Sequence, residues 1–190
     1  MIKAILFDCF GVLAEDGWTP FKRKYIVHDP QLALEVADLG KQTDLGIISY
    51  EQMIKQISEL VQVEPDLLRG AVERKVPNQE LFSYITAELK PHYKIGLLSN
   101  ANYDVLNQLF TPEQAGVFDS SVISFEAQLT KPDSRMFELA ASRLGFRPEE
   151  CLFIDDVERY CQAAEDMGMR SLLYINLETF LPAIAQKLNN

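Results

Sequence analysis

The sequence predicts an α/β fold, a doubly wound parallel sheet interrupted by a small all-helical insertion. Short, nearly continuous apolar runs recur along the chain, and such runs are typical of parallel strands buried on both faces of a sheet. Helical patterns separate the later runs, whereas the stretch from residue 14 to 90 holds helical patterns and no convincing strand. The expected strands are residues 2–7, 94–98, 151–154 and 170–175, with a weaker candidate at 120–123.

The helices of the sheet-bearing part are predicted over residues 133–144, 159–167 and 178–188. The first begins at a Lys-Pro-Asp turn and ends at Gly145, and the second ends at Gly168. Glycine is favoured just beyond a helix end, because it adopts the left-handed conformation without steric cost. Strand and helix alternate from about residue 92 onward, which indicates the doubly wound arrangement.

The insertion is predicted to be a cap that follows the first strand directly. Ser49 with Gln52 forms a helix-starting pair, and Pro65 suits a first helical position. An insertion at the C-terminal end of a strand lies over the place where open α/β sheets bind ligands. The chain is therefore expected to divide into a core of residues 1–13 and 91–190 and a helical cap of residues 14–90. Helical patterns within the cap cover residues 30–41, 49–61, 66–75 and 78–89.

Composition narrows the possible partners. The chain has 190 residues, of which 47% are hydrophobic, enough for the core of one domain. A net charge of −10 argues against binding to nucleic acid or to anionic membranes, and no apolar run is long enough to span a bilayer. Three cysteines, without a secretion signal, favour reduced thiols in the cytoplasm. We therefore expect a cytoplasmic protein, and the small helical cap suggests a closable site for a small molecule rather than for a protein substrate.

Polar residues fall at the ends of the predicted strands or just beyond them. Asp8 ends the first strand, Ser99 and Asn100 end the second, and Asp155 with Asp156 ends a later one. Lys131 lies in a loop before a helix. Each alone has an ordinary explanation, such as a helix cap or a turn. Because parallel strands open onto one crevice at their carboxyl ends, the ordered set predicts a single site.

With these motifs the chain resembles the haloacid dehalogenase superfamily of hydrolases, in the group with a small helical cap. The resemblance covers essentially the full length and implies a Rossmann-like core. It also implies that Asp8 is a nucleophile that forms a covalent intermediate with the substrate. The matching stretches are residues 6–13, 98–100, 116–119, 131–133 and 153–156, with 163–169 as the tail of the last motif.

The resemblance also implies roles for the other residues. Ser99 and Lys131 join Asp8 as catalytic residues, with Lys131 neutralising charge on the nucleophile and on the phosphoryl group. Asp156 is expected to bind Mg²⁺ directly and Asp155 through water, and the uncompensated repulsion of these carboxylates predicts that Mg²⁺ stabilises the fold. The implied phosphate-binding residues are Cys9, Phe10, Ser99, Asn100 and Lys131, and the implied metal ligands are Asp8, the backbone carbonyl of Phe10, Asp155 and Asp156.

Phe10 departs from the pattern of the family's phosphatases. Those enzymes carry an Asp two residues after the nucleophile, which protonates the leaving oxygen and then activates water. A phenyl ring can do neither, and general acid–base help is typically worth about 10²–10⁴ in rate. Its backbone carbonyl is unaffected. We therefore expect binding to survive and turnover to be slow or atypical.

Three functions remain open at this point. The leading one is Mg²⁺-dependent hydrolysis of a small-molecule phosphate ester through an aspartyl-phosphate intermediate. The second is a 2-haloacid dehalogenase, since that branch carries an aromatic residue at the position of Phe10 and halide leaves without a proton. Against it stands the Asp155-Asp156 pair, and Arg23 is a weak candidate for the substrate-carboxylate clamp. The third is a catalytically impaired module that binds a phosphorylated ligand and has a binding or regulatory role instead of an enzymatic one.

Neighbours of the site carry smaller expectations. The thiol of Cys9 is expected to be buried and to face away from the crevice rather than to react. Asn102 and Tyr103 are candidates for substrate contact. Tyr160 stands where relatives often carry a small polar Asn, which is expected to weaken the support of the Asp pair.

Overall fold

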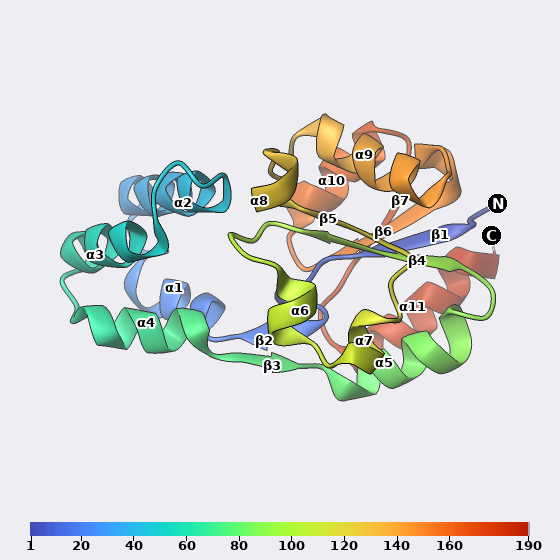
Figure 1. Cartoon of the computed structure of the whole chain (residues 1–190), viewed down its shortest axis with the longest axis horizontal. Helices are drawn as coiled ribbons and strands as arrows, with labels where there is room; N and C mark the ends of the chain where they lie inside the picture. The colour runs from blue at the N-terminus through green and yellow to red at the C-terminus, as the bar shows by residue number, and fades with distance from the viewer. Residues whose placement is uncertain (190) are drawn as a thin grey trace.

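The computed structural model describes residues 1–189 and contains a five-stranded sheet with helices on both faces (Figure 1). The strand order is β5-β4-β1-β6-β7, and every neighbouring pair is parallel. The chain builds outward from β1 first to one side and then to the other, so the predicted doubly wound α/β fold is confirmed. The strands are β1 (Ala4–Phe7), β4 (Lys94–Ser99), β5 (Ser120–Ile123), β6 (Cys151–Asp155) and β7 (Arg170–Leu173).

The central strand β1 is buried on both faces. Successive side chains of a strand point to opposite faces. Ile5 and Phe7 therefore join one apolar cluster, whereas Ala4 and Leu6 join another on the opposite face. Both faces are dry, which explains why the sequence of this strand is a continuous apolar run rather than an alternating one.

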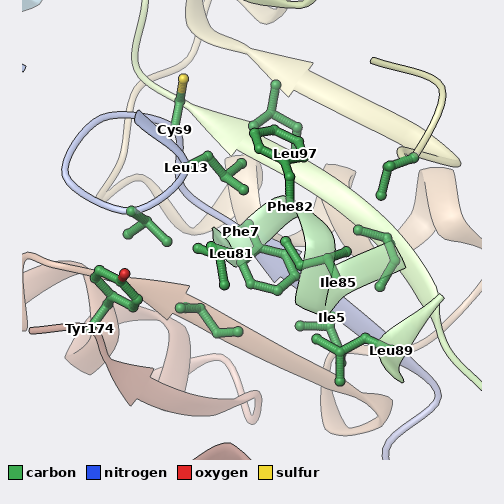
Figure 2. Packing of buried hydrophobic residues seen from close by; sticks show 14 of the residues in the cluster. Ile5, Phe7, Cys9, Leu13, Leu81, Phe82, Ile85, Leu89, Leu97 and Tyr174 are labelled. Atoms are coloured by element: carbon green, nitrogen blue, oxygen red, sulfur yellow. The ribbon is translucent and has the colours of Figure 1, made fainter. Parts of the chain in front are cut away.

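Helices α9 (Ser134–Leu144) and α10 (Glu158–Asp166) cover the face of Leu6, where Phe137 packs edge-on against Phe153. The opposite face is covered by α5 (Gln79–Tyr84), the π-helical turn at Ile85–Leu89 and α11 (Leu177–Asn189). Figure 2 shows Leu81, Phe82 and Ile85 packed around Phe7 on this face. Short elements complete the core, namely α6 (Val105–Leu109), α7 (Pro112–Ala115), α8 (Ser124–Ala127) and a 3₁₀ turn at Pro148–Glu150.

Four helices with their own apolar cluster lie to one side of the sheet (Figure 1). They are α1 (Trp18–Tyr25), α2 (Pro30–Asp44), α3 (Tyr50–Val61) and α4 (Pro65–Glu73), here called the cap helices. Phe21, Ile54 and Leu68 are among the buried residues that they share. The predicted start signals are present, since Ser49 and Gln52 form a capping box and Pro65 is the first residue of α4. None of the helices in the described residues is long and apolar enough to cross a membrane.

Two features of the predicted insertion differ from expectation. The stretch contains two strands, β2 (Ala14–Asp16) and β3 (Lys75–Pro77), which pair antiparallel and connect the cap helices to the sheet. Each has three residues, too few for a periodic pattern to show. The last predicted helix, residues 78–89, packs on the sheet and not on the cap helices, because its buried side chains belong to the cluster of Phe7. The cap boundary at 14–90 stays a prediction.

Asp119 fastens the loop before β5 to the start of β4. Its carboxylate accepts hydrogen bonds from Nζ of Lys90 (2.6 Å), from Nζ of Lys94 (2.8 Å) and from the backbone N–H of Ile95 (2.9 Å). Burial alone would raise the pKa of this carboxyl, but the hydrogen bonds from the two lysines lower it to about 2. Asp119 is therefore charged at neutral pH and joins two segments far apart in sequence.

Replacing Asp119 by Asn is expected to lower the free energy of unfolding by about 1–2 kcal/mol near neutral pH, because hydrogen bonds to a charged acceptor are lost. The folded-state pKa of about 2 lies below the usual value, which is about 3.9 for Asp. The stabilisation is thus complete above about pH 4 and is lost as the pH falls through the folded-state value. Urea unfolding at neutral and acidic pH measures this, with Glu59→Gln on the exposed face of α3 as a matched loss of charge. A difference that does not shrink in acid would contradict it.

Candidate active site

The C-terminal ends of three neighbouring strands meet at the predicted site. Asp8 directly follows β1, Ser99 ends β4 and Asp155 ends β6. Asp8 lies level with Asp155, because Phe7 is in register with Ile154, and Ser99 lies one residue further along, because Phe7 is in register with Leu97. The topology thereby brings together residues that are about ninety and about one hundred and fifty positions apart in the sequence.

Lys131 lies between two buried carboxylates. Its Nζ is 2.7 Å from Oδ1 of Asp8 and 2.6 Å from Oδ2 of Asp155. Its side chain is 1% exposed, so water hardly reaches these contacts and the charges interact strongly. Burial alone would lower the pKa of Lys131, but the charges of Asp155 and Asp8 raise it above its usual value. The ammonium therefore stays charged.

The backbone of Lys131 is held by Asn100, at the end of β4. The Lys131 N–H donates to Oδ1 of Asn100 (2.8 Å), and Nδ2 of Asn100 donates to the Lys131 carbonyl (3.2 Å). The ammonium also lies over the rings of Phe153 (5.3 Å to the centroid) and Tyr160 (5.1 Å). The ring of Tyr160 thus forms part of the wall around this charge.

Asp8, Asp155 and Asp156 form one acidic group, each offering a carboxylate oxygen within 4.8 Å of the others. Each oxygen of Asp155 has one partner, since Oδ2 contacts Lys131 and Oδ1 accepts from the Val157 N–H (2.8 Å). The close approach of Asp156 requires glycine at position 11, where a Cβ would lie 2.4 Å from its Oδ2 and where φ is +88°.

The protonation of this group reflects an excess of negative charge. Burial raises the pKa of Asp8, and the Asp155 carboxylate raises it further against the opposing charge of Lys131. Burial and the charge of Asp155 likewise raise the pKa of Asp156 to about 6. Three carboxylates face one ammonium, so a divalent cation with a preference for oxygen ligands would complete the charge balance. This donor set fits Mg²⁺.

The hydroxyl of Ser99 is buried and has no hydrogen-bond partner among the described residues. Such an orphan is rare in native structures, because an unpaired buried hydroxyl loses its hydration without compensation. Ser99 lies at the strand end beside Asp8, as the sequence predicted. An oxygen of a bound anion would give this donor its missing acceptor.

The two residues that follow Asp8, Cys9 and Phe10, differ in how deeply their side chains are buried. The side chain of Cys9 belongs to the same buried apolar cluster as Phe7 (Figure 2), and burial raises the pKa of its thiol well above the usual range. The thiol is therefore un-ionised, in keeping with the expected passive role. Phe10 is only partly buried and packs at the margin of the same cluster.

The chain matches the model of the haloacid dehalogenase-like hydrolases over residues 2–168. It belongs to this family of hydrolases. The matched span includes every element that supplies the acidic group and Lys131, and it includes the cap helices.

Known proteins are similar to this chain over nearly its whole length. YhcW of Bacillus subtilis strain 168, a phosphatase candidate, is 26% identical over 191 residues, covering 94% of this chain and 86% of that protein. The structure of a family hydrolase from Porphyromonas gingivalis has a TM-score of 0.72 at 30% identity and covers 100% of this chain and 99% of its own. A family enzyme from Bacteroides thetaiotaomicron, solved in complex with magnesium and inorganic phosphate, has a TM-score of 0.67 at 24% identity and covers 96% and 99%.

The structure adds two charged residues that the sequence did not single out in this hydrolase. Lys75 of β3 donates from Nζ to the hydroxyl of Tyr103 (2.7 Å) and lies over the rings of Tyr103 (4.4 Å) and Phe10 (5.0 Å). Burial lowers its pKa. Asp44 ends α2, and burial raises its pKa to about 7 against the charges of Lys131 and Lys75. No sequence motif pointed to Asp44 or Lys75. Lys75 falls where a helix was expected to end, a common place for lysine.

Replacing Lys131 by Met is expected to lower the free energy of unfolding by about 3 kcal/mol, because Asp8 and Asp155 are left buried without their cation. Urea unfolding in a metal-free buffer measures the change. The matched control is Lys55→Met on the exposed face of α3, which should shift stability by less than about 0.5 kcal/mol. A loss equal to that of the control would show that the ion pairs add nothing to stability.

Proposed function

We propose that this hydrolase cleaves a small-molecule phosphate ester in a Mg²⁺-dependent reaction, with Asp8 as the nucleophile. The observation that carries the proposal is the buried arrangement of Asp8, Lys131 and Asp155 with Asp156 beside them. The relatives support it, since one is a phosphatase candidate and another was solved with magnesium and inorganic phosphate. The three buried, free cysteines are in keeping with a cytoplasmic location.

The chemistry follows from the residues around Asp8. A carboxylate oxygen of Asp8 attacks phosphorus, the bond to the leaving oxygen breaks, and an aspartyl phosphate forms. Lys131 offsets the charge that gathers on Asp8 and on the phosphoryl oxygens. The Ser99 hydroxyl and the Asn100 amide supply hydrogen bonds to the same oxygens. Water then attacks the aspartyl phosphate, which releases phosphate and regenerates Asp8.

The acidic group would hold Mg²⁺ through Asp8, Asp156 and the backbone carbonyl of Phe10, with Asp155 acting through water. Asp155 suits this more distant role, because Lys131 and the Val157 N–H already occupy its two oxygens. When bound, the cation would neutralise negative charge on the phosphate and make it a better electrophile. Within the predicted cap of residues 14–90, the cap helices would cover the site and exclude water from it, whereas residues 78–89 pack on the sheet.

A dehalogenase is the weaker candidate. Halide departure needs no cation, yet three carboxylates are packed together here. Arg23, the weak candidate for a carboxylate clamp, is exposed in the last turn of α1. Its exposure gives no support to a role in the crevice.

Two substitutions test the proposed chemistry on aryl phosphates. Asp8→Asn should abolish Mg²⁺-dependent phosphate release, because the nucleophile is lost. Phe10→Asp should raise the rate on phenyl phosphate by about 10²-fold, the lower range of general acid–base help. No gain would show that Phe10 is not the cause of slow turnover. Metal-independent chloride release from 2-chloropropionate would favour the dehalogenase, and phosphate binding with no turnover would favour a binding module.

Saturating Mg²⁺ should raise the melting temperature by about 5–10 °C, since a ligand at about 100 times its dissociation constant adds about 2.7 kcal/mol of stability. Differential scanning calorimetry with and without the ion measures this. Asp156→Asn should remove most of the shift, whereas Asp66→Asn on the exposed first turn of α4 should keep it. A melt that does not respond to Mg²⁺ would count against the metal site.

A further inference from the structure

We propose that Lys75 is a catalytic residue whose ammonium binds the leaving oxygen of the substrate and stabilises its negative charge as the bond to phosphorus breaks. The assignment rests on the phosphatase function proposed above. It gives the site a cation on the side where Phe10 has replaced the usual acid.

Lys75 lies next to Phe10. It lies on β3, one of the two strands that lead between the sheet and the cap helices, in register with Asp16 of β2. Its Nζ is 5.0 Å from the centroid of the Phe10 ring, and Phe10 is two residues beyond the nucleophile. The ammonium therefore lies beside the side chain that stands where a proton donor would be.

The ammonium of Lys75 has unused hydrogen-bond donors. An ammonium group has three N–H donors. Lys75 uses one of them, to the Tyr103 hydroxyl, and no carboxylate lies within 4.0 Å of its Nζ among the described residues. The two aromatic rings attract the charge without accepting a conventional hydrogen bond. Lys131, in contrast, is held by two carboxylates at under 2.8 Å.

The surroundings of the Lys75 ammonium are partly shielded from water. Lys75 is half-buried, and the rings of Phe10 and Tyr103 keep water from two sides of its charge. A hydrogen bond from an ammonium to an oxyanion is strong in such surroundings, because little solvent competes with it. Asp44 feels the charges of both Lys131 and Lys75, which indicates that the two lysines act on one region below the cap helices.

The step balances without an acid–base reaction at Lys75. The bond between Asp8 and phosphorus forms, the bond from phosphorus to the leaving oxygen breaks, and its electron pair stays on that oxygen. Lys75 donates a hydrogen bond to the oxyanion and remains an ammonium, while the oxyanion takes a proton from water. Lys75 therefore assists the first half of the reaction and leaves the second, hydrolysis of the aspartyl phosphate, unassisted.

The test compares substrates that differ in leaving group. Lys75→Met should lower kcat/KM for phenyl phosphate by about 10²-fold, the typical effect of removing one oxyanion donor. Phenoxide is a poorer leaving group than p-nitrophenoxide and depends more on this donor. With p-nitrophenyl phosphate, whose leaving group needs little stabilisation, the loss should stay below about 5-fold. Lys75→Gln serves as a second variant if the Met variant does not fold. Lys55→Met, with its exposed side chain, should leave both rates unchanged.

The outcomes separate the assignment from the function on which it rests. If wild-type protein releases phosphate in an Asp8-dependent manner and Lys75→Met has no effect, Lys75 is not catalytic. Equal losses with both substrates would mean that Lys75 only positions Tyr103 and Phe10, and would also overturn the assignment. If the wild-type protein releases phosphate from neither compound, the phosphatase function itself fails.

Discussion

The ammonium of Lys131 between the carboxylates of Asp8 and Asp155 is the interaction around which the rest of the site is built. Two acidic side chains at adjacent strand ends would repel each other if both were ionised and unpaired in a dry interior. Lys131 makes their burial tolerable, and Asn100 fixes the loop that delivers it. The sheet can therefore end in carboxylates without losing the apolar packing beneath them.

That interaction leaves the site short of positive charge. One ammonium cannot neutralise Asp8, Asp155 and Asp156 together, and the raised pKa values of Asp8 and Asp156 express this shortage. Unpaired groups in a native site are most simply explained by a ligand. The acidic group can take a divalent cation and the buried Ser99 hydroxyl can donate to an anion, so under the proposed function a metal ion and a phosphorylated substrate would pair both groups.

The sequence predicted what depends on strong local patterns. The continuous apolar run of β1 ends at Asp8, and the other strand ends carry their polar residues in order, so the meeting of these side chains at one edge of the sheet could be inferred from the sequence. Contacts between short elements were missed. The three residues of β3 are too few to show a periodic pattern. The contacts of Lys75 are with Phe10 and Tyr103, which lie 65 and 28 residues away, so its sequence neighbours do not predict its position. The helix at 79–84 looked like its neighbours, because an amphipathic pattern does not reveal which partner the apolar stripe meets.

The antiparallel pair of β2 and β3 also bears on how such a protein can diversify. The two strands run side by side from the sheet and are closed at their far end by a hydrogen bond from the Gly17 N–H to the Arg74 carbonyl (2.9 Å). The residues between 17 and 74 are thus joined to the sheet through this pair of strands. Lys75 lies on the sheet side of that closure. If the cap helices cover the site as proposed, exchanging them for another helical segment would change which substrates the site admits and leave the contacts of Lys75 with Phe10 and Tyr103 in place.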